Sequence, residues 1–214
     1  MTVKSRSFVA LIVLGIVAMS VAVWFGFLSG YLAANKETQR ANDLLTSAPN
    51  TSSEASAEPS ELLVEGVPTV GEYFAVMRIP ALGKDWLRTV SEGTTPEVLD
   101  HLGVGRYEGT ELPGTPGNFA VAGHSGSSWT PFAKLDTLEN GELIEVETLS
   151  TKYVYEIVNA EVVEETDVNT VYENPKFGTS LDNDQWLTIT TCLTEGPKDL
   201  RYVVYAKLKE QSVR

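Results

Sequence analysis

Cysteine and histidine are scarce in this sequence of 214 residues, which contains one cysteine, Cys192, and two histidines. A single thiol cannot form a disulfide within the chain, so a disulfide-stabilised scaffold is excluded. The sequence also lacks the Cys/His clusters of a structural zinc site and the glycine-rich loop that binds phosphates. We therefore predict no metal ion and no nucleotide cofactor.

Basic residues are also few: 16 Lys and Arg stand against 29 Asp and Glu, which gives a formal net charge of −13. Such a chain repels the phosphates of nucleic acids, so we predict no nucleic acid partner. The acidic residues Glu164, Glu165, Asp167 and Glu173 follow no calcium-loop spacing. We interpret them as a solvated acidic surface that favours solubility.

Charge is missing altogether from residues 8–34, which are mostly Val, Leu, Ile, Ala, Phe and Gly. This run exceeds the roughly 20 residues that a helix needs to cross the hydrocarbon core of a bilayer. Lys4 and Arg6 precede it, and positive charge favours the cytoplasmic side. Aromatic residues that suit an interfacial belt lie toward its other end: Trp24, Phe25, Phe27 and Tyr31. The sequence predicts a cytoplasmic tail over residues 1–7, one transmembrane anchor over 8–34, and an extracellular remainder.

A cleaved signal peptide is the competing interpretation of this run. Its apolar core would measure about 7–15 residues and end at an Ala-x-Ala-like site. The observed run is longer, and Leu-Ala-Ala at residues 32–34 fits such a site poorly. An uncleaved anchor is therefore favoured.

Residues 35–69 contain no aromatic residue and are rich in Ser, Thr, Ala, Glu and Pro. Such a segment buries too little apolar surface to offset its conformational entropy, so we predict a disordered linker here. Within it, residues 36–45 have a composition compatible with a short extension of the preceding helix. The remaining residues, 70–210, have the length of one ordinary domain.

Short strand-like runs dominate residues 70–210, with Pro and Gly between them. They include residues 76–79, 119–123, 143–147, 152–158, 187–192 and 201–208. Thr-Pro pairs at residues 95–96 and 130–131 predict the starts of two short helices. Many strands with few helices and no internal repeat predict a mainly β domain, closed or nearly closed into a barrel.

Three residues with reactive or charged side chains lie at the ends of these runs. Cys192 ends residues 187–192, His124 follows residues 119–123, and Arg201 begins the last run. If the residues between Cys192 and Arg201 form a hairpin loop, these two side chains are neighbours across paired strands. Whether His124 joins them depends on tertiary structure.

Side-chain alternation along residues 187–192 adds a second feature. Thr188, Thr190 and Cys192 share one face of the strand, and Leu187 and Ile189 share the other. The apolar face is suited to a core and the hydroxyl-rich face to a groove. By itself, a lone thiol at a strand end can also be a small buried hydrophobe without any chemistry.

These residues resemble the sortases, cysteine transpeptidases of the Gram-positive cell surface. The sortase pattern Thr-Leu-x-Thr-Cys is matched by Thr-Ile-Thr-Thr-Cys at residues 188–192, with Arg201 downstream and Ala-Gly-His at 122–124 upstream. Further segments are similar to the actinobacterial branch called class E: residues 79–86, 105–107, 112–118 and 131–135. The resemblance covers about residues 73–208. Two positions depart from the pattern: Ser125 stands where relatives often carry Arg, and Ile189 where many carry Leu.

The resemblance implies a closed eight-stranded sortase-type β-barrel with a few short helices, preceded by the transmembrane helix. It implies that Cys192 is the nucleophile, His124 the acid and base, and Arg201 the hydrogen-bond donor to the substrate carbonyl or the oxyanion. The substrates would be surface proteins with a C-terminal Leu-Pro-x-Thr-Gly or Leu-Ala-x-Thr-Gly signal, cleaved between Thr and Gly. The acceptor would be an amine of a cell-wall precursor.

Substrate contacts and alternatives complete the hypothesis. We predict that Thr190, Thr191 and Trp129 bind the substrate, although Trp129 is also compatible with a core position. A hydrolytic cysteine protease is one alternative function. An L,D-transpeptidase is another, but its usual Ser-x-Gly-Cys is not found here. The third alternative is a non-catalytic surface-binding module with an incidental thiol.

Overall fold

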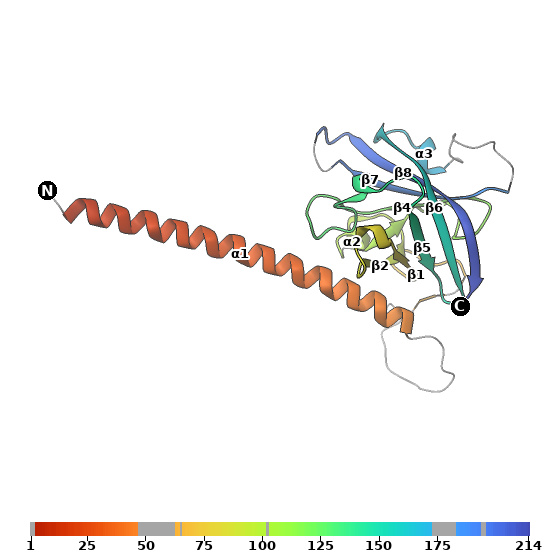
Figure 1. The fold of residues 1–214 in the computed structure, drawn as a ribbon, viewed down its shortest axis with the longest axis horizontal. Coiled ribbons are helices and arrows are strands. Elements are labelled where there is room, and N and C mark those ends of the chain that lie inside the picture. Colours follow the sequence, from red (N-terminus) through yellow and green to blue (C-terminus); the bar gives the residue numbers. More distant parts are fainter. Residues whose placement is uncertain (1–2, 47–62, 65, 102, 173–182, 194–195) are drawn as a thin grey trace.

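A computed structural model describes residues 3–46, 63–64, 66–101, 103–172, 183–193 and 196–214, and Figure 1 shows the fold. Within these residues, eight strands close into a barrel in the order β1-β2-β3-β4-β7-β8-β6-β5, and β1 pairs with β5. The strands are β1 Tyr73–Arg78, β2 Leu87–Glu92, β3 Val104–Arg106, β4 Gly117–Ala122, β5 Leu143–Glu147, β6 Thr151–Glu164, β7 Gln185–Cys192 and β8 Leu200–Val213. The predicted closed eight-stranded barrel is confirmed.

Short helices lie between the strands, as predicted. They are η2 Pro80–Leu82, α2 Pro96–Leu99, η3 Leu135–Thr137 and α3 Asn169–Tyr172. α2 begins after Thr95 with Pro96 in its first turn, which confirms the first Thr-Pro prediction. The second prediction is wrong, because residues 131–134 form turns. Here the Phe132 amide donates to the His124 carbonyl at 3.0 Å and so ties this segment back to the end of β4.

Strand pairing brings three chain segments to one end of the barrel. β4 and β7 are parallel, with Ala122 opposite Thr190. β7 and β8 are antiparallel, with Cys192 opposite Arg201. The ends of β4 and β7 therefore lie beside the start of β8.

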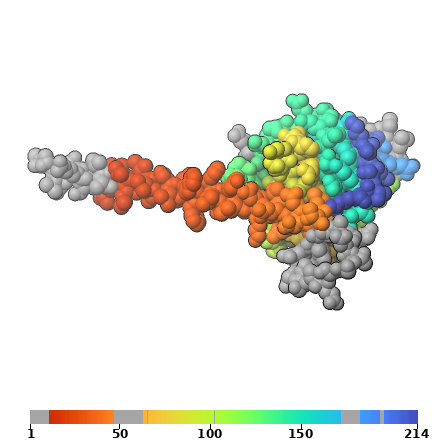
Figure 2. All heavy atoms as spheres, turned by 60° about the horizontal axis from the view of Figure 1, so that its bottom comes forward, coloured from red at the N-terminus to blue at the C-terminus, as the bar shows by residue number. Residues whose placement is uncertain are grey.

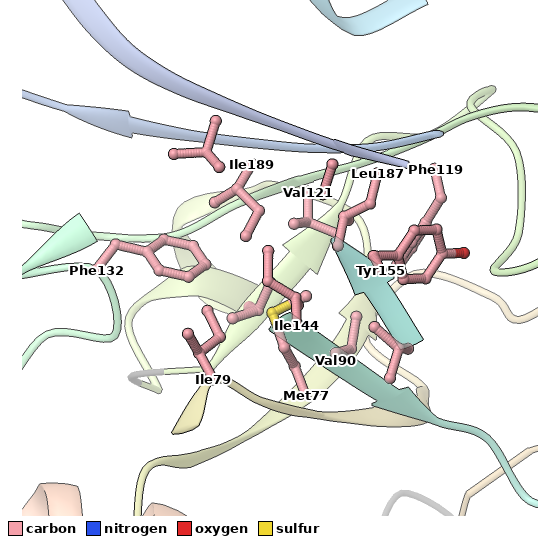
Figure 3. Packing of buried hydrophobic residues seen from close by; sticks show 14 of the residues in the cluster. Met77, Ile79, Val90, Phe119, Val121, Phe132, Ile144, Tyr155, Leu187 and Ile189 are labelled. Atoms are coloured by element: carbon pink, nitrogen blue, oxygen red, sulfur yellow. The ribbon is translucent and has the colours of Figure 1, made fainter. Parts of the chain in front are cut away.

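Apolar side chains from alternate strand positions fill the barrel (Figure 3). Phe119 and Val121 of β4 and Leu187 and Ile189 of β7 are all buried in this core. Tyr155 of β6 is buried with them, and its hydroxyl accepts a hydrogen bond from the Gly114 amide at 2.9 Å. The period-2 assignment of Leu187 and Ile189 to the core face is thus correct, and it fixes the orientation of the rest of β7.

The N-terminal helix α1 (Val3–Thr46) is longer than the predicted anchor. Its residues 11–46 contain a stretch that is apolar and long enough to cross a membrane, with a mean hydropathy of 2.5. In Figure 2 the later, orange part of α1 lies along the barrel surface. There Ala41 and Leu44 are buried and pack with Val76 and Leu87.

This packing corrects the predicted boundary of the linker. Residues 35–46 were assigned to it, with a short extension of the helix over 36–45 left open, and they are helical. The contact of their later part with the barrel was not predicted, because it depends on tertiary structure. Residues 47–62 and 65 of the predicted linker lie outside the described residues.

A buried ion pair braces the barrel between β2 and β3. Arg106 Nε donates to Glu92 Oε2 at 2.6 Å, and a second guanidinium nitrogen donates to Oε1 at 2.8 Å. Both side chains are nearly inaccessible to solvent. Each charge depends on the other, since either one alone would be desolvated without compensation.

Replacement of Glu92 by alanine is therefore expected to lower the free energy of unfolding by about 3–5 kcal/mol, the cost typical of breaking a buried pair. Urea unfolding followed by circular dichroism measures the change. Lys84→Ala is the control, because Lys84 lies 3.9 Å from Asp85 and both side chains are exposed. Surface pairs of this kind contribute little. Equal stability of Glu92→Ala and the unmodified chain would contradict the prediction.

Candidate active site

The candidate site forms where β4 and β7 end side by side. In their parallel register Ala122 lies opposite Thr190. His124 and Cys192 each follow these positions by two residues. The pairing thus brings together two residues that are 68 positions apart in the sequence.

Hydrogen bonds fasten the His124 segment to the end of β7. The Thr191 hydroxyl donates to the Gly123 carbonyl at 2.7 Å, and the Gly123 amide donates to the Thr190 carbonyl at 3.3 Å. The buried Ser125 hydroxyl donates to the carbonyl of Cys192 itself at 2.5 Å. The backbone on both sides of His124 is therefore positioned by the strand that carries the thiol.

Cys192 is exposed, unlike the residues of β7 that precede it. Exposure excludes the interpretation of this thiol as a small buried hydrophobe. A reagent or a substrate can reach the sulfur from solvent, which a nucleophile requires.

His124 has a carboxylate partner that the sequence did not indicate. Its Nε2 lies 3.1 Å from Oδ1 of Asp100, the residue that directly follows α2. The imidazole is 42% and the Asp100 side chain 69% exposed, so the pair contributes orientation rather than stability. The contact engages the Nε2 atom of the ring.

Arg201 lies directly across the β7–β8 pair from Cys192, as the hairpin hypothesis predicted. Its guanidinium forms an ion pair with Glu165 at 2.5 Å. It also donates to the carbonyls of Lys198 at 2.8 Å and Leu200 at 3.0 Å. The guanidinium thus has an acidic partner, Glu165, which directly follows β6.

A pocket of about 210 Å³ opens beside the thiol. Apolar and polar residues line it together: Phe132, Leu135, Asp136, Thr191, Cys192, Leu193 and Tyr202. Desolvation raises the pKa of the Tyr202 hydroxyl, and the Asp136 carboxylate raises it further. The phenol therefore stays neutral at physiological pH and can donate a hydrogen bond within the pocket.

The three residues predicted to bind substrate occupy different environments. Thr190 and Thr191 are buried, and the Thr190 hydroxyl is 2.8 Å from the Tyr107 hydroxyl. Thr191 forms part of the pocket wall. Trp129 packs against α1, with its ring centroid 4.8 Å from that of Phe27. Their roles toward a substrate stay predictions.

Metal ligation was not predicted, and the acidic residues are consistent with a solvated surface. Among the residues that the structure describes, no group of three or more His, Cys, Asp or Glu is placed to hold a metal ion. Glu165 instead pairs with Arg201. Glu173 lies outside the described residues.

Comparison with known proteins identifies this arrangement. The family model described as the sortase domain matches residues 77–209, which include the thiol, the imidazole and the guanidinium. The chain belongs to the sortase family. Sortases are cysteine transpeptidases, and the chain is most like those of class E, as the motifs predicted.

Among its relatives, sortase SrtE1 of Streptomyces coelicolor is 32% identical over 151 residues, which make up 67% of this chain and 42% of that protein. The chain therefore matches less than half the length of this relative. The solved structure of sortase E from Streptomyces avermitilis is 35% identical, with a TM-score of 0.61 over 68% of this chain and 93% of that one. Sortase E1 from S. coelicolor, solved with a tripeptide in its active site, is 30% identical, with a TM-score of 0.62 over 69% and 94%.

Three residues of this sortase site were missed as site residues by sequence reasoning. Asp100 contacts His124, Glu165 holds Arg201, and Ser125 bonds the backbone of Cys192. Only Ser125 carried a signal, since it departs from the Arg that relatives often have. Asp100 and Glu165 are ordinary acidic residues in the sequence, and only the barrel topology brings them to the site.

Proposed function

We propose that this sortase is a membrane-anchored transpeptidase that cleaves a C-terminal sorting signal between Thr and Gly and joins the protein to a cell-wall amine. The signal would be of the Leu-Pro-x-Thr-Gly or Leu-Ala-x-Thr-Gly type. The observation that carries the proposal is the exposed Cys192 at the end of β7, with His124 fastened beside that strand end and Arg201 opposite.

The first half of the reaction is acyl transfer to sulfur. The Cys192 thiolate attacks the Thr carbonyl carbon, and the C–N bond to Gly then breaks. The leaving amine takes a proton from the His124 imidazolium. The products are a thioacyl-enzyme and a free peptide that begins with Gly.

The second half returns the enzyme to its starting state. An acceptor amine attacks the thioester carbonyl and gives its proton to the now neutral imidazole. The C–S bond breaks and the sulfur leaves as a thiolate. Attack by water in place of the amine would make the enzyme a hydrolase, so the acceptor decides the reaction class.

Arg201 is suited to bind the oxygen that gains charge in both halves. Guanidinium carries five donors and stays charged, so it can donate to an oxyanion while its other nitrogens keep protein contacts. Glu165 and the two carbonyls at the start of β8 hold its plane in a fixed orientation. Such a preorganised donor does not need to be reoriented during the reaction.

Product analysis with and without an amine tests the proposed function. The protein is incubated with quenched peptides of both signal types, and products are identified by mass spectrometry. We expect cleavage between Thr and Gly and, with an added amine, a ligated product. Cleavage without ligation at any amine concentration would favour a hydrolytic protease. No cleavage and no thiol alkylation would favour a non-catalytic module.

Replacement of Arg201 by lysine tests the role of the planar guanidinium group. Lysine keeps the charge and the pairing with Glu165 but loses bidentate geometry, so turnover should fall more than peptide affinity. Separate kcat and KM values measure the split. Arg78→Lys is the matched control, because Arg78 also pairs with a carboxylate, Glu145 at 3.7 Å, and is similarly exposed. Full activity of Arg201→Lys would show that turnover does not depend on the planar geometry of the guanidinium.

The proposed localisation is a single-pass membrane protein of a Gram-positive cell, with its barrel outside. The charge-free stretch of α1 and the preceding Lys4 and Arg6 support this orientation. External protease on intact protoplasts should therefore cut the chain within residues 47–62 and give a fragment that contains the barrel without α1. Immunoblotting with an antibody to the C-terminus detects the fragment. A barrel that is protected until the protoplasts are lysed would mean the reverse orientation.

A further inference from the structure

Trp129 packs on one side of α1 at the end of its apolar stretch. Its indole lies edge-on to Phe27, with 4.8 Å between centroids, and to Tyr31, with 5.8 Å. Between these two aromatic residues lies Gly30, where any Cβ would overlap the indole ring. The missing side chain of Gly30 thus forms a notch that Trp129 fills.

Trp129 belongs to the segment that leaves the active site. Residues 125–130 follow His124 directly, and the Thr130 amide and hydroxyl both bond the Ser127 carbonyl, at 3.1 and 2.6 Å. Two residues later, the Phe132 amide donates to the His124 carbonyl. The contact with α1 is therefore made by a hydrogen-bonded turn that directly follows His124.

A second set of contacts fixes α1 further along its length. The buried Glu37 carboxylate accepts hydrogen bonds from the amide and hydroxyl of Thr89 on β2. Arg88 donates to Thr38 at 3.3 Å and stacks over Trp86. These contacts and the Gly30 notch are seven or eight residues apart, about 11 Å along the helix. Two attachments at this separation set the height of the barrel along α1.

The thickness of the bilayer gives the position of Gly30 relative to the hydrocarbon core. At 1.5 Å per residue, about 20 residues span a hydrocarbon core of about 30 Å, so an upright helix that enters at residue 8 leaves it near Phe27. Gly30 is then about 4.5 Å above the hydrocarbon, within the headgroup layer of about 5–7 Å. Tryptophan is enriched at this level.

The composition of the segment agrees with that location. Residues 125–130 are Ser, Gly, Ser, Ser, Trp and Thr, polar but without charge. In a chain with a net charge of −13, such a segment avoids repulsion from anionic lipid.

We propose that residues 125–130 contact the phospholipid headgroups of the membrane that holds α1, and that Trp129 in the Gly30 notch sets this position. The inference rests on the proposed membrane anchoring and goes beyond it. The end of the barrel with Cys192 and His124 then lies at the bilayer surface, and the enzyme acts on substrates presented within a few ångströms of the lipid.

Disulfide trapping tests the notch. In full-length Cys192→Ala protein in nanodiscs of phosphatidylcholine and phosphatidylglycerol, a cysteine at position 30 should cross-link under mild oxidation to one at position 129. A cysteine at position 32, on the other side of the helix, should not cross-link to position 129. Equal trapping of the two pairs, or none at position 30, would overturn the proposed docking.

Fluorescence quenching tests the depth. In the same Cys192→Ala background, a fluorophore on Ser128→Cys should be quenched by lipids labelled at the headgroup. One on Ser212→Cys should not be quenched, because the end of β8 lies beside Leu45 of α1, whose carbonyl accepts a hydrogen bond from Arg214. Leu45 is 15 residues, or about 23 Å, further along α1 than Gly30. A fluorophore on Val17→Cys should be quenched by lipids labelled in the acyl chain. Quenching at position 17 but not at 128 would overturn this inference alone, and quenching at neither would overturn the anchoring as well.

A larger side chain at position 30 tests whether the contact with Trp129 determines the quenching of the fluorophore at position 128. Gly30→Leu places a side chain where the indole lies, so the segment must move, and quenching at Ser128→Cys should change. Gly26→Leu is the matched control, since a Cβ there meets nothing within 4 Å. Equal quenching in the two variants would show that the notch does not position the segment.

Discussion

Replacement of Cys192 by alanine is expected to abolish the thioacyl-enzyme and all turnover. Alanine removes the sulfur and nothing else, so no atom remains that can form the covalent intermediate. The fold should persist, because the thiol is exposed and takes part in no disulfide. Intact-mass spectrometry of enzyme mixed with a sorting peptide measures the adduct, and circular dichroism verifies the fold.

The native protein is the positive control, with the adduct mass equal to the peptide fragment that ends in Thr. An adduct on Cys192→Ala would place the nucleophile elsewhere. A folded native protein that forms no adduct with either signal type would contradict the proposed acyl transfer. Alkylation of the native thiol would then show whether Cys192 is reactive without being acylated by these peptides.

Replacement of His124 by alanine is expected to lower kcat/KM by a factor of about 10²–10⁴, the contribution typical of general acid–base catalysis. Without the imidazole, the leaving amine receives no positioned proton and the acceptor amine loses its base. Steady-state kinetics with a quenched peptide and an added amine measure the loss. Added imidazole should restore part of the rate, which a purely structural defect would not allow.

His101→Ala is the matched control for this experiment. His101 is the other histidine, it is exposed, and it lies next to Asp100 without being part of the β4–β7 end. A comparable loss in His101→Ala would point to a general effect of histidine removal. A near-native rate for His124→Ala would remove His124 from the mechanism and require another activator for Cys192.

The sequence predicted those features that local pattern determines. Alternating apolar residues identified the strands, and Leu187 and Ile189 were correctly assigned to the core. The short connection between β7 and β8 predicted the register of Cys192 with Arg201. The position of His124 was beyond local reasoning, because it depends on parallel pairing between strands that are more than 60 residues apart.

Local pattern also could not supply the partners of side chains that suit two environments. The alternation along β7 correctly grouped Thr188 with Thr190, but it could not show that their hydroxyls are already bonded to Asn118 and Tyr107. Trp129 was predicted to bind substrate or to lie in a core, and the sequence could not show that its ring contacts Phe27 of α1. In each case the partner comes from a distant segment, and an aromatic or hydroxyl group fits both environments.

The place of β7 in the barrel also determines when this enzyme can become active during biosynthesis. A chain is made from its N-terminus, so α1 and the strands up to β6 exist before residue 185 has been added. The nucleophile arrives on β7, which pairs with the existing β4 on one side and with β8, made after it, on the other. A chain that ends between His124 and Cys192 therefore has the imidazole without the thiol or Arg201, and the set is complete only after β8 has begun.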